Sequence, residues 1–157
     1  MSNPMENPMK KSLLAAGLAV ALVSGSALAQ MKPEVMVKQR QAVMTLMGKY
    51  WGPMAGMMQG RVPYDAKIVQ RNAGFLDNLS RMPWDGFDAA TKDVKSAALP
   101  VIYSDTAKFA EAADRLQNEA SKLYAVSRSG DEAAVKAQMG AVGKSCGGCH
   151  ESFRQKQ

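Results

Sequence analysis

CGGCH, at positions 146–150, stands close to the end of this 157-residue chain. It contains both cysteines, Cys146 and Cys149, and the only histidine, His150. On a helix, residues at i, i+3 and i+4 share a face, so two thiols and an imidazole would point the same way. C-x-x-C-H is the order of covalent c-type haem attachment. The thiols bind the two vinyl groups of the porphyrin, and the imidazole binds its iron.

Three other interpretations compete for these five residues. A disulfide would suit an oxidising compartment, but it leaves the adjacent histidine unexplained. A thioredoxin-like redox motif belongs at the start of a helix in a βαβ unit, and the sequence has no pattern of a parallel sheet. Structural zinc usually takes four protein ligands, and the chain has three cysteine and histidine side chains. We therefore favour one covalent haem c per chain, attached through Cys146 and Cys149 with His150 on the iron.

The first 29 residues have the pattern of a secretory signal peptide. Lys10 and Lys11 form a positive n-region, residues 13–23 are apolar, and residues 27–29 read A-L-A, a typical cleavage site. The alternative is a membrane anchor, for which the apolar run is shorter than the roughly 20 residues that a span needs. The pattern predicts export, and covalent haem is attached outside the cytoplasm.

Cleavage after Ala29 would leave one domain of residues 30–157, in the bacterial periplasm and not held in a membrane. Either Met1 or Met9 is the start of translation. Loss of the signal lowers the net charge from +6 to +5, because two lysines and one glutamate are removed. The remaining basic residues are scattered, which argues against nucleic acid as a partner. A weak attraction to an acidic periplasmic redox partner is compatible with this charge.

The domain is predicted to be all-α. It is rich in Ala and Met and poor in Val, Ile and Thr, a bias that favours helices over strands. Proline, glycine and capping residues divide it into four predicted helices, at about 33–59, 65–82, 104–127 and 132–154. Their lengths and links indicate an up-down-up-down antiparallel four-helix bundle with the haem bound in its core.

Local patterns refine this prediction. Asp65 and Ser104 are placed as N-caps of the second and third helices, and Pro53 should bend the first. The apolar side of the second helix is predicted to comprise Ile68, Val69, Phe75, Leu76, Leu79 and Met82. Glycines near the haem motif fit either a porphyrin lying against the backbone or close contact between helices.

The whole exported part of the chain resembles cytochrome c′, the class II c-type cytochromes. The matching segments are CGGCH itself, RQAVMTLM at 40–47, PYD at 63–65 and PWDGF at 83–87. The position of the haem motif supports this resemblance. Class I cytochromes c carry the motif near the amino terminus and take a methionine ligand from far downstream, whereas seven residues follow His150 here and none is methionine.

The resemblance implies a homodimer, formed through the first helix, with pentacoordinate high-spin iron. It also implies roles for six further residues. Met44 would block the sixth coordination position, Arg40 and Gln41 would contact haem propionates, Trp84 and Phe87 would line the pocket, and Arg154 would lie beside the imidazole. Each has a plainer interpretation as well: core packing for the apolar side chains, a surface or interface charge for Arg40, and a helix-terminal cation for Arg154.

Three functions remain in competition. The leading one is binding of NO and CO at an open iron site, for sequestration of or tolerance to NO, since an apolar distal face disfavours O₂, which needs a hydrogen-bond donor. The second is a low-spin electron carrier with a methionine of the first helix as sixth ligand. The third is an enzyme such as a peroxidase. We do not favour it, because the single histidine is already assigned to the proximal side.

Overall fold

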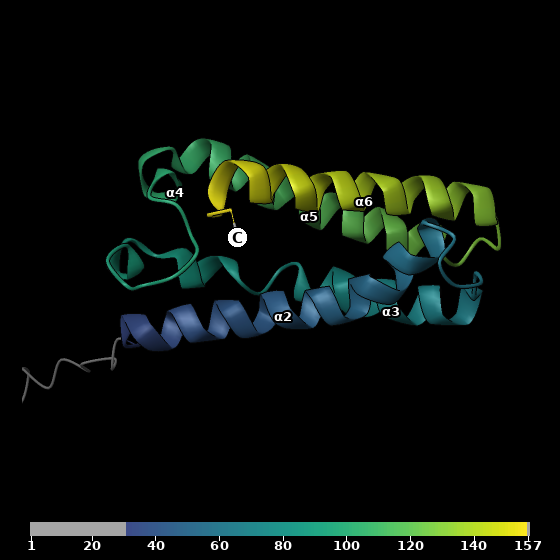
Figure 1. Ribbon diagram of the computed structural model, residues 1–157, viewed down its shortest axis with the longest axis horizontal. Coiled ribbons are helices and arrows are strands. Elements are labelled where there is room, and N and C mark those ends of the chain that lie inside the picture. Colours follow the sequence, from purple (N-terminus) through teal and green to yellow (C-terminus); the bar gives the residue numbers. More distant parts are fainter. Residues whose placement is uncertain (1–30, 157) are drawn as a thin grey trace, which may run out of the picture. The chain divides into compact units, whose positions relative to one another are not determined.

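Four long antiparallel helices make up the domain (Figure 1). The computed structural model describes residues 31–156, so the predicted signal peptide lies outside the described part of the chain. The helices are α2 (Pro33–Met58), α3 (Ala66–Leu79), α5 (Thr106–Val126) and α6 (Glu132–Phe153). Each packs against the next, and α6 also packs against α2, which closes the bundle. The predicted fold class is confirmed.

Three aspartates begin three of the long helices. Asp65 accepts hydrogen bonds from the amides of Lys67 and Ile68, 2.9 and 3.0 Å away. In the same way Asp105 begins α5 and Asp131 begins α6. Each carboxylate satisfies amides that have no partner within the first turn of the helix. Gly130, with φ near +80°, makes the turn that separates α5 from α6.

The connection from α3 to α5 contains three short helices. They are η1 (Trp84–Phe87), η2 (Ala89–Thr91) and α4 (Val101–Ser104). The prediction that Ser104 caps the third long helix is wrong, because Ser104 ends α4 and Asp105 is the cap. The hydroxyl of Ser104 instead donates to the carbonyl of Val101, within its own turn.

The second long helix is shorter than predicted. It ends at Leu79 and not at Met82. Met82 directly precedes Pro83, and a proline disfavours helical geometry in the residue before it. Phe75 and Met82 were assigned to its apolar side, but they are 44% and 55% exposed. The prediction is wrong for these two residues, because Met82 lies beyond the helix and Phe75 packs at a tilt against Tyr50 at the surface, with ring centroids 4.6 Å apart.

The core runs along the inside of the bundle and draws on all four long helices. Its buried members are Met47, Met54, Met57, Val69, Ala73, Leu76, Leu116, Ala120, Leu123, Val135, Met139 and Val142. In Figure 1 the last turns of α2 tilt away from the rest of that helix, as expected for a helix that contains Pro53. Within residues 31–156, no helix is long and apolar enough to cross a bilayer.

Truncation of Leu123 should test this core. Leu123→Ala removes a fully buried side chain from α5, and we expect a loss of about 2–5 kcal/mol in the free energy of unfolding. Urea unfolding followed by circular dichroism measures it. Met82→Ala, at an exposed methionine, is the matched control and should change stability by no more than about 0.5 kcal/mol. Equal losses in the two variants would contradict the assigned core.

Candidate haem site

The haem motif lies on the last turns of α6. Cys146, Cys149 and His150 occur within one helix, at the spacing that places them on a shared face. Both thiols are free and partly buried, so the disulfide interpretation is not supported. The helical context likewise does not match a thioredoxin-like site. Cys146 also packs against the edge of the hydrophobic core, whereas His150, on the same face, is exposed.

Burial keeps the motif in its neutral form at neutral pH. Burial, with a smaller contribution from the neighbouring Cys149, raises the pKa of Cys146 to about 11. Burial also raises the pKa of Cys149. Partial burial and the positive charge of Arg154 lower the pKa of His150. A neutral imidazole is the form that binds a metal ion, so the environment of His150 favours ligation of iron.

The glycines of α6 have different surroundings. A Cβ on Gly143 would lie 3.3 Å from the Trp51 ring, so this glycine allows α2 and α6 to approach closely. A Cβ on Gly147 or Gly148 would meet no described atom within 4 Å. Helix contact therefore explains Gly143. Gly147 and Gly148, one and two residues after Cys146, point away from the helix face that carries the two thiols, so their open surroundings do not mark the place of the porphyrin.

The α2 residues assigned to the site differ in environment. Arg40 is buried, with 3% of its surface exposed, whereas Gln41 is exposed. Met44 is partly buried and packs against the same core as Cys146. Arg40 and Met44 are one turn apart and therefore share a face of α2. The interpretation of Arg40 as a surface charge is wrong.

Arg40 is surrounded by the α3–α5 connection. Its guanidinium donates to the carbonyl of Gly86 and to the hydroxyls of Thr91, Ser96 and Tyr103. It also lies over the ring of Phe87, 4.2 Å from the ring centroid. All four acceptors are neutral oxygens.

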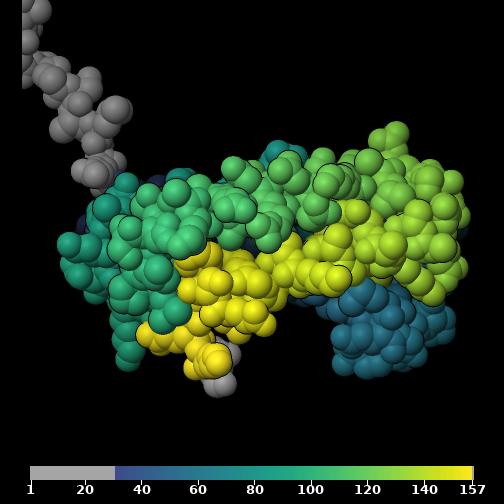
Figure 2. All heavy atoms as spheres, turned by 90° about the horizontal axis from the view of Figure 1, so that it is seen from above, coloured from purple at the N-terminus to yellow at the C-terminus, as the bar shows by residue number. Residues whose placement is uncertain are grey.

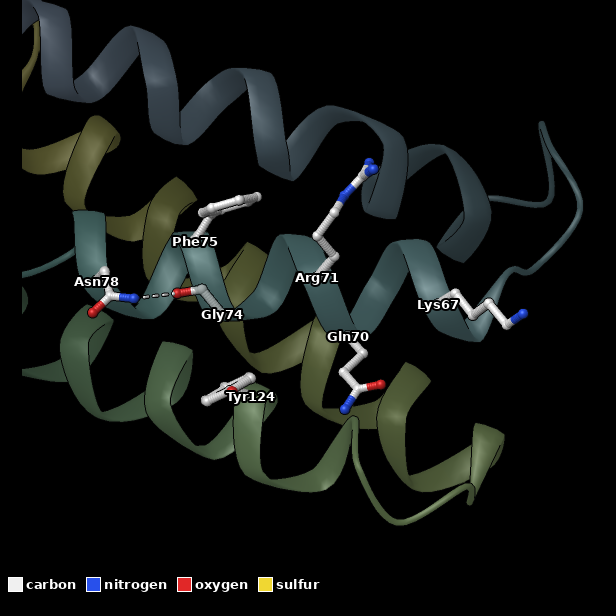
Figure 3. A pocket seen from close by; sticks show the side chains of 7 residues that line it. All are labelled: Lys67, Gln70, Arg71, Gly74, Phe75, Asn78 and Tyr124. Atoms are coloured by element: carbon white, nitrogen blue, oxygen red, sulfur yellow. Dashed lines mark hydrogen bonds between the residues drawn. The ribbon is translucent and has the colours of Figure 1, made fainter.

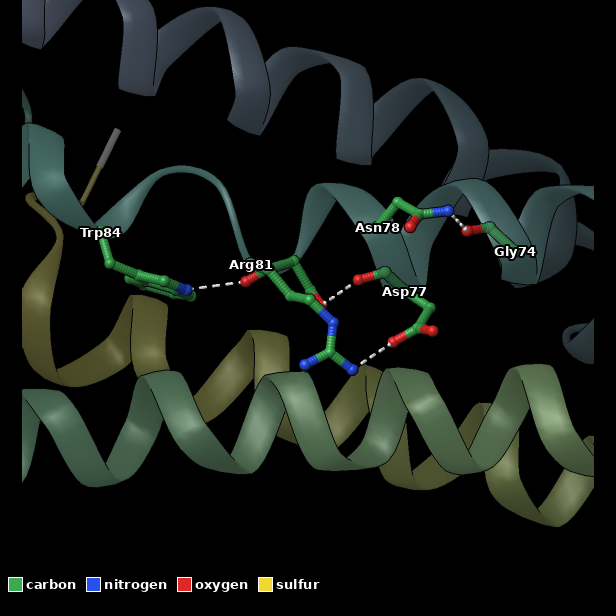
Figure 4. Close-up of polar contacts among 6 residues, drawn as sticks. Gly74, Asp77, Asn78, Arg81 and Trp84 are labelled. Carbon is green, nitrogen blue, oxygen red and sulfur yellow. Dashed lines mark hydrogen bonds and ion pairs between the residues drawn. The ribbon is translucent and has the colours of Figure 1, made fainter.

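Trp84 and Phe87 belong to an aromatic cluster at the same end of the bundle. Phe109 of α5 lies between them and Phe153 of α6, with centroid distances of 5.9 Å to Trp84, 4.8 Å to Phe87 and 5.3 Å to Phe153. The indole nitrogen of Trp84 donates to the carbonyl of Ser80 at 2.7 Å, which fixes the ring (Figure 4). Trp84 and Phe87 also line a groove of about 400 Å³ along α5.

The end of α6 is tied to the α3–α5 connection by backbone hydrogen bonds. The amide of Leu99 donates to the carbonyl of Phe153 at 2.9 Å, and that of Gln155 donates to Ala97 at 2.8 Å. Arg154 lies between these two bonds and pairs with Ala98 as an isolated bridge. In Figure 2 the yellow end of α6 lies directly against the green part of this connection. The turn that follows His150 is therefore held in place.

Comparison with known proteins agrees with this arrangement. The family model for cytochrome c′ matches residues 35–154. A cytochrome c′ of Rubrivivax gelatinosus is 37% identical over 126 residues, which cover 80% of this chain and 98% of that protein. The chain belongs to the cytochrome c′ family. Members of this family bind haem c, and Cys146, Cys149 and His150 supply the attachment motif here.

Solved structures of the family carry diatomic gases. A nitric oxide complex of a leucine-to-isoleucine mutant of Alcaligenes xylosoxidans cytochrome c′ is 38% identical, with a TM-score of 0.73, and the match covers 80% of this chain and 98% of that one. A carbon monoxide-bound variant of that cytochrome c′ gives the same TM-score and coverage. A relative named cytochrome c-556, from Agrobacterium tumefaciens, is 31% identical over 121 residues, which cover 77% of this chain and 98% of that protein.

The described residues fit haem c. Two free thiols and an imidazole lie on one helix face, and a buried cation stands without an anion on α2. Cys146 and Cys149 would hold the haem, and His150 would bind its iron. When bound, the haem supplies an iron that can bind gases and change its oxidation state.

Sequence reasoning missed part of this end of the bundle. Thr91, Ser96, Tyr103 and Phe153 contact Arg40 or the aromatic cluster, yet none was assigned to the site. Only Phe153 had a usable signal, since it lies one helical turn after Cys149 on the motif's face. A second groove, between α3 and α5, is about 330 Å³ in volume, and no residue of the motif lines it (Figure 3).

Proposed function

We propose that this protein is a periplasmic gas-binding haem c protein with pentacoordinate, high-spin iron. The observation that carries the proposal is that the only histidine belongs to the haem motif, while Met44 of α2 packs against the same core as Cys146. One strong axial ligand leaves the sixth position for NO or CO. The gas complexes of the related A. xylosoxidans structures support this. Sequestration of NO is the role that we favour, and we do not propose an enzyme.

A low-spin electron carrier is the second candidate. The specific observation in its favour is the thioether of Met44, a side chain that can itself bind iron. One of the related proteins, from Agrobacterium tumefaciens, is named cytochrome c-556 and not cytochrome c′. In this candidate the protein would transfer electrons to a periplasmic redox partner. Its positive net charge favours a partner with an acidic surface.

The absorption spectrum distinguishes the two candidates. The reduced protein should show a broad visible band that changes to a nitrosyl spectrum when NO is added. Met44→Ala should then increase the rate of CO binding about tenfold, which corresponds to about 1.4 kcal/mol of barrier, because it removes bulk from the open position. Stopped-flow absorbance measures this rate, and Met58→Ala, near the end of α2, is the control.

Sharp α and β bands before any gas is added would contradict the open site. If Met44→Leu abolished those bands while Met58→Leu retained them, Met44 would be the sixth ligand. The protein would then be the electron carrier.

We propose in addition that two copies associate through α2. Val35 and Leu46 of α2 are each 40% exposed, and Phe75 of α3 extends this apolar surface. Leu46→Glu should shift the mass in solution from that of a dimer to that of a monomer, because it places a charge in the apolar contact. Light scattering after gel filtration measures the mass, with Val62→Glu, at an exposed valine outside α2, as the control. A monomeric parent protein would contradict this proposal.

The export proposal rests on the sequence of residues 1–29. Mass spectrometry of the protein from a periplasmic fraction should show a chain that begins at Gln30 and carries one haem. Residues 1–29 on the haem-loaded protein would contradict cleavage after Ala29.

A further inference from the structure

Arg40 is the only charged side chain among the buried residues of the described chain. Its hydrogen bonds all end on neutral oxygens, and none of the five ion pairs found within residues 31–156 includes it. Of the aspartates nearest in sequence to its partners, Asp85, Asp88 and Asp93 are exposed, and Asp105 pairs with Lys108 at 2.8 Å. The carboxylate of Asp88 accepts a hydrogen bond from the amide of Ala90.

A buried cation without an anion is costly. Removing a charge from water costs several kcal/mol, and neutral hydrogen-bond acceptors offset only part of that cost. Haem c carries two propionate groups, which are anions at neutral pH. A propionate would therefore supply the countercharge that the protein does not supply to Arg40.

Three hydroxyl groups, those of Thr91, Ser96 and Tyr103, form a cage around the guanidinium of Arg40. Thr91 and Tyr103 lie 3.1 and 3.3 Å from Nη1 of Arg40 and 3.0 Å from each other, and Ser96 lies 3.1 Å from Nη2. Thr91 is fully buried. The Phe87 ring covers one face of the guanidinium. Nη1 and Nη2 are thus fixed by the cage, whereas Nε does not donate to it.

The cage is also fixed to the end of α6. Ser96 accepts a hydrogen bond from the amide of Ala98, which pairs with Arg154. The same connection therefore contacts Arg40 on α2 and the turn after His150 on α6. A displacement of the guanidinium would require this connection to move.

We propose that Thr91, Ser96 and Tyr103 are positioning residues that hold the cation of Arg40 for a haem propionate and thereby raise the reduction potential of the iron. The inference rests on the proposed function as a haem c protein and on the contact between Arg40 and the propionates that the family resemblance implies. A fixed positive charge near the haem favours the ferrous state, which carries one positive charge fewer than the ferric state. Its effect is strong where water is excluded, because the local dielectric constant is low.

The reduction potential of the haem-loaded protein tests this proposal. Arg40→Met should lower the midpoint potential, because it removes the cation. Tyr103→Phe, Ser96→Ala and Thr91→Val should each lower it by less, since each releases one contact. Tyr124→Phe, at a half-exposed tyrosine of α5 that is not part of the cage, is the control and should leave the potential unchanged. Spectroelectrochemical titration at one pH and one salt concentration measures all five variants.

A double-mutant cycle separates positioning from a general structural effect. In the Arg40→Met background, Tyr103→Phe should no longer shift the potential, because the cation through which it acts is absent. An equal shift in the presence and absence of Arg40 would overturn the proposal, as would an unchanged potential in Arg40→Met. If Arg40→Met does not fold, Arg40→Gln replaces it, since the side-chain amide also removes the charge but can still donate hydrogen bonds to the cage.

Failure of this inference can be told apart from failure of the proposed function. A protein that forms the nitrosyl complex, yet keeps its potential in Arg40→Met, would refute the cage and leave gas binding intact. A protein that does not bind NO, yet shows the coupled shifts, would refute gas binding and support the cage. Urea unfolding of the same variants shows whether a change in potential merely follows a loss of stability.

Discussion

One face of α6 both closes the core and carries the haem motif. Val135, Met139 and Val142 are buried at steps of four and three residues, and the same steps lead on to Cys146, Cys149 and Phe153. The stripe that packs into the bundle thus continues into the residues that hold the haem. The cofactor would then occupy the place that further apolar side chains would otherwise fill. The packing of the bundle and the haem site therefore depend on the same helix face.

The other long helices meet this constraint in different ways at the two ends of α6. At its start they fill the bundle with methionine and leucine, and Trp51 packs directly onto Gly143. At its end, Phe153 packs on the aromatic cluster and Arg154 pairs with the α3–α5 connection. That connection lacks a long helix, which lets it fold around Arg40 and still reach the end of α6. The irregular backbone of this connection thus encloses the charge of Arg40.

Two of the charged groups at the haem-motif end of the bundle are arginines. The motif itself is neutral at neutral pH, since burial raises the pKa of both thiols and lowers that of His150. The nearby positive charges are Arg154, beside His150, and the buried Arg40. In the proposed haem site, both cations would favour ferrous iron, which carries one positive charge fewer than ferric iron. Ferrous iron is also the state in which haem proteins bind CO, so the proposal links the reduction potential to gas binding.

The sequence by itself determined the class of the fold and the chemistry of the motif. Both are local properties: helix periodicity and aspartate caps act within a few residues, and C-x-x-C-H is read directly. It could not determine that Ser104 ends a short helix, that Phe75 and Met82 face solvent, or that Arg40 is buried. The tertiary structure decided these points. Thr91, Ser96 and Tyr103 are more than fifty positions from Arg40 and meet it only when the connection folds over α2.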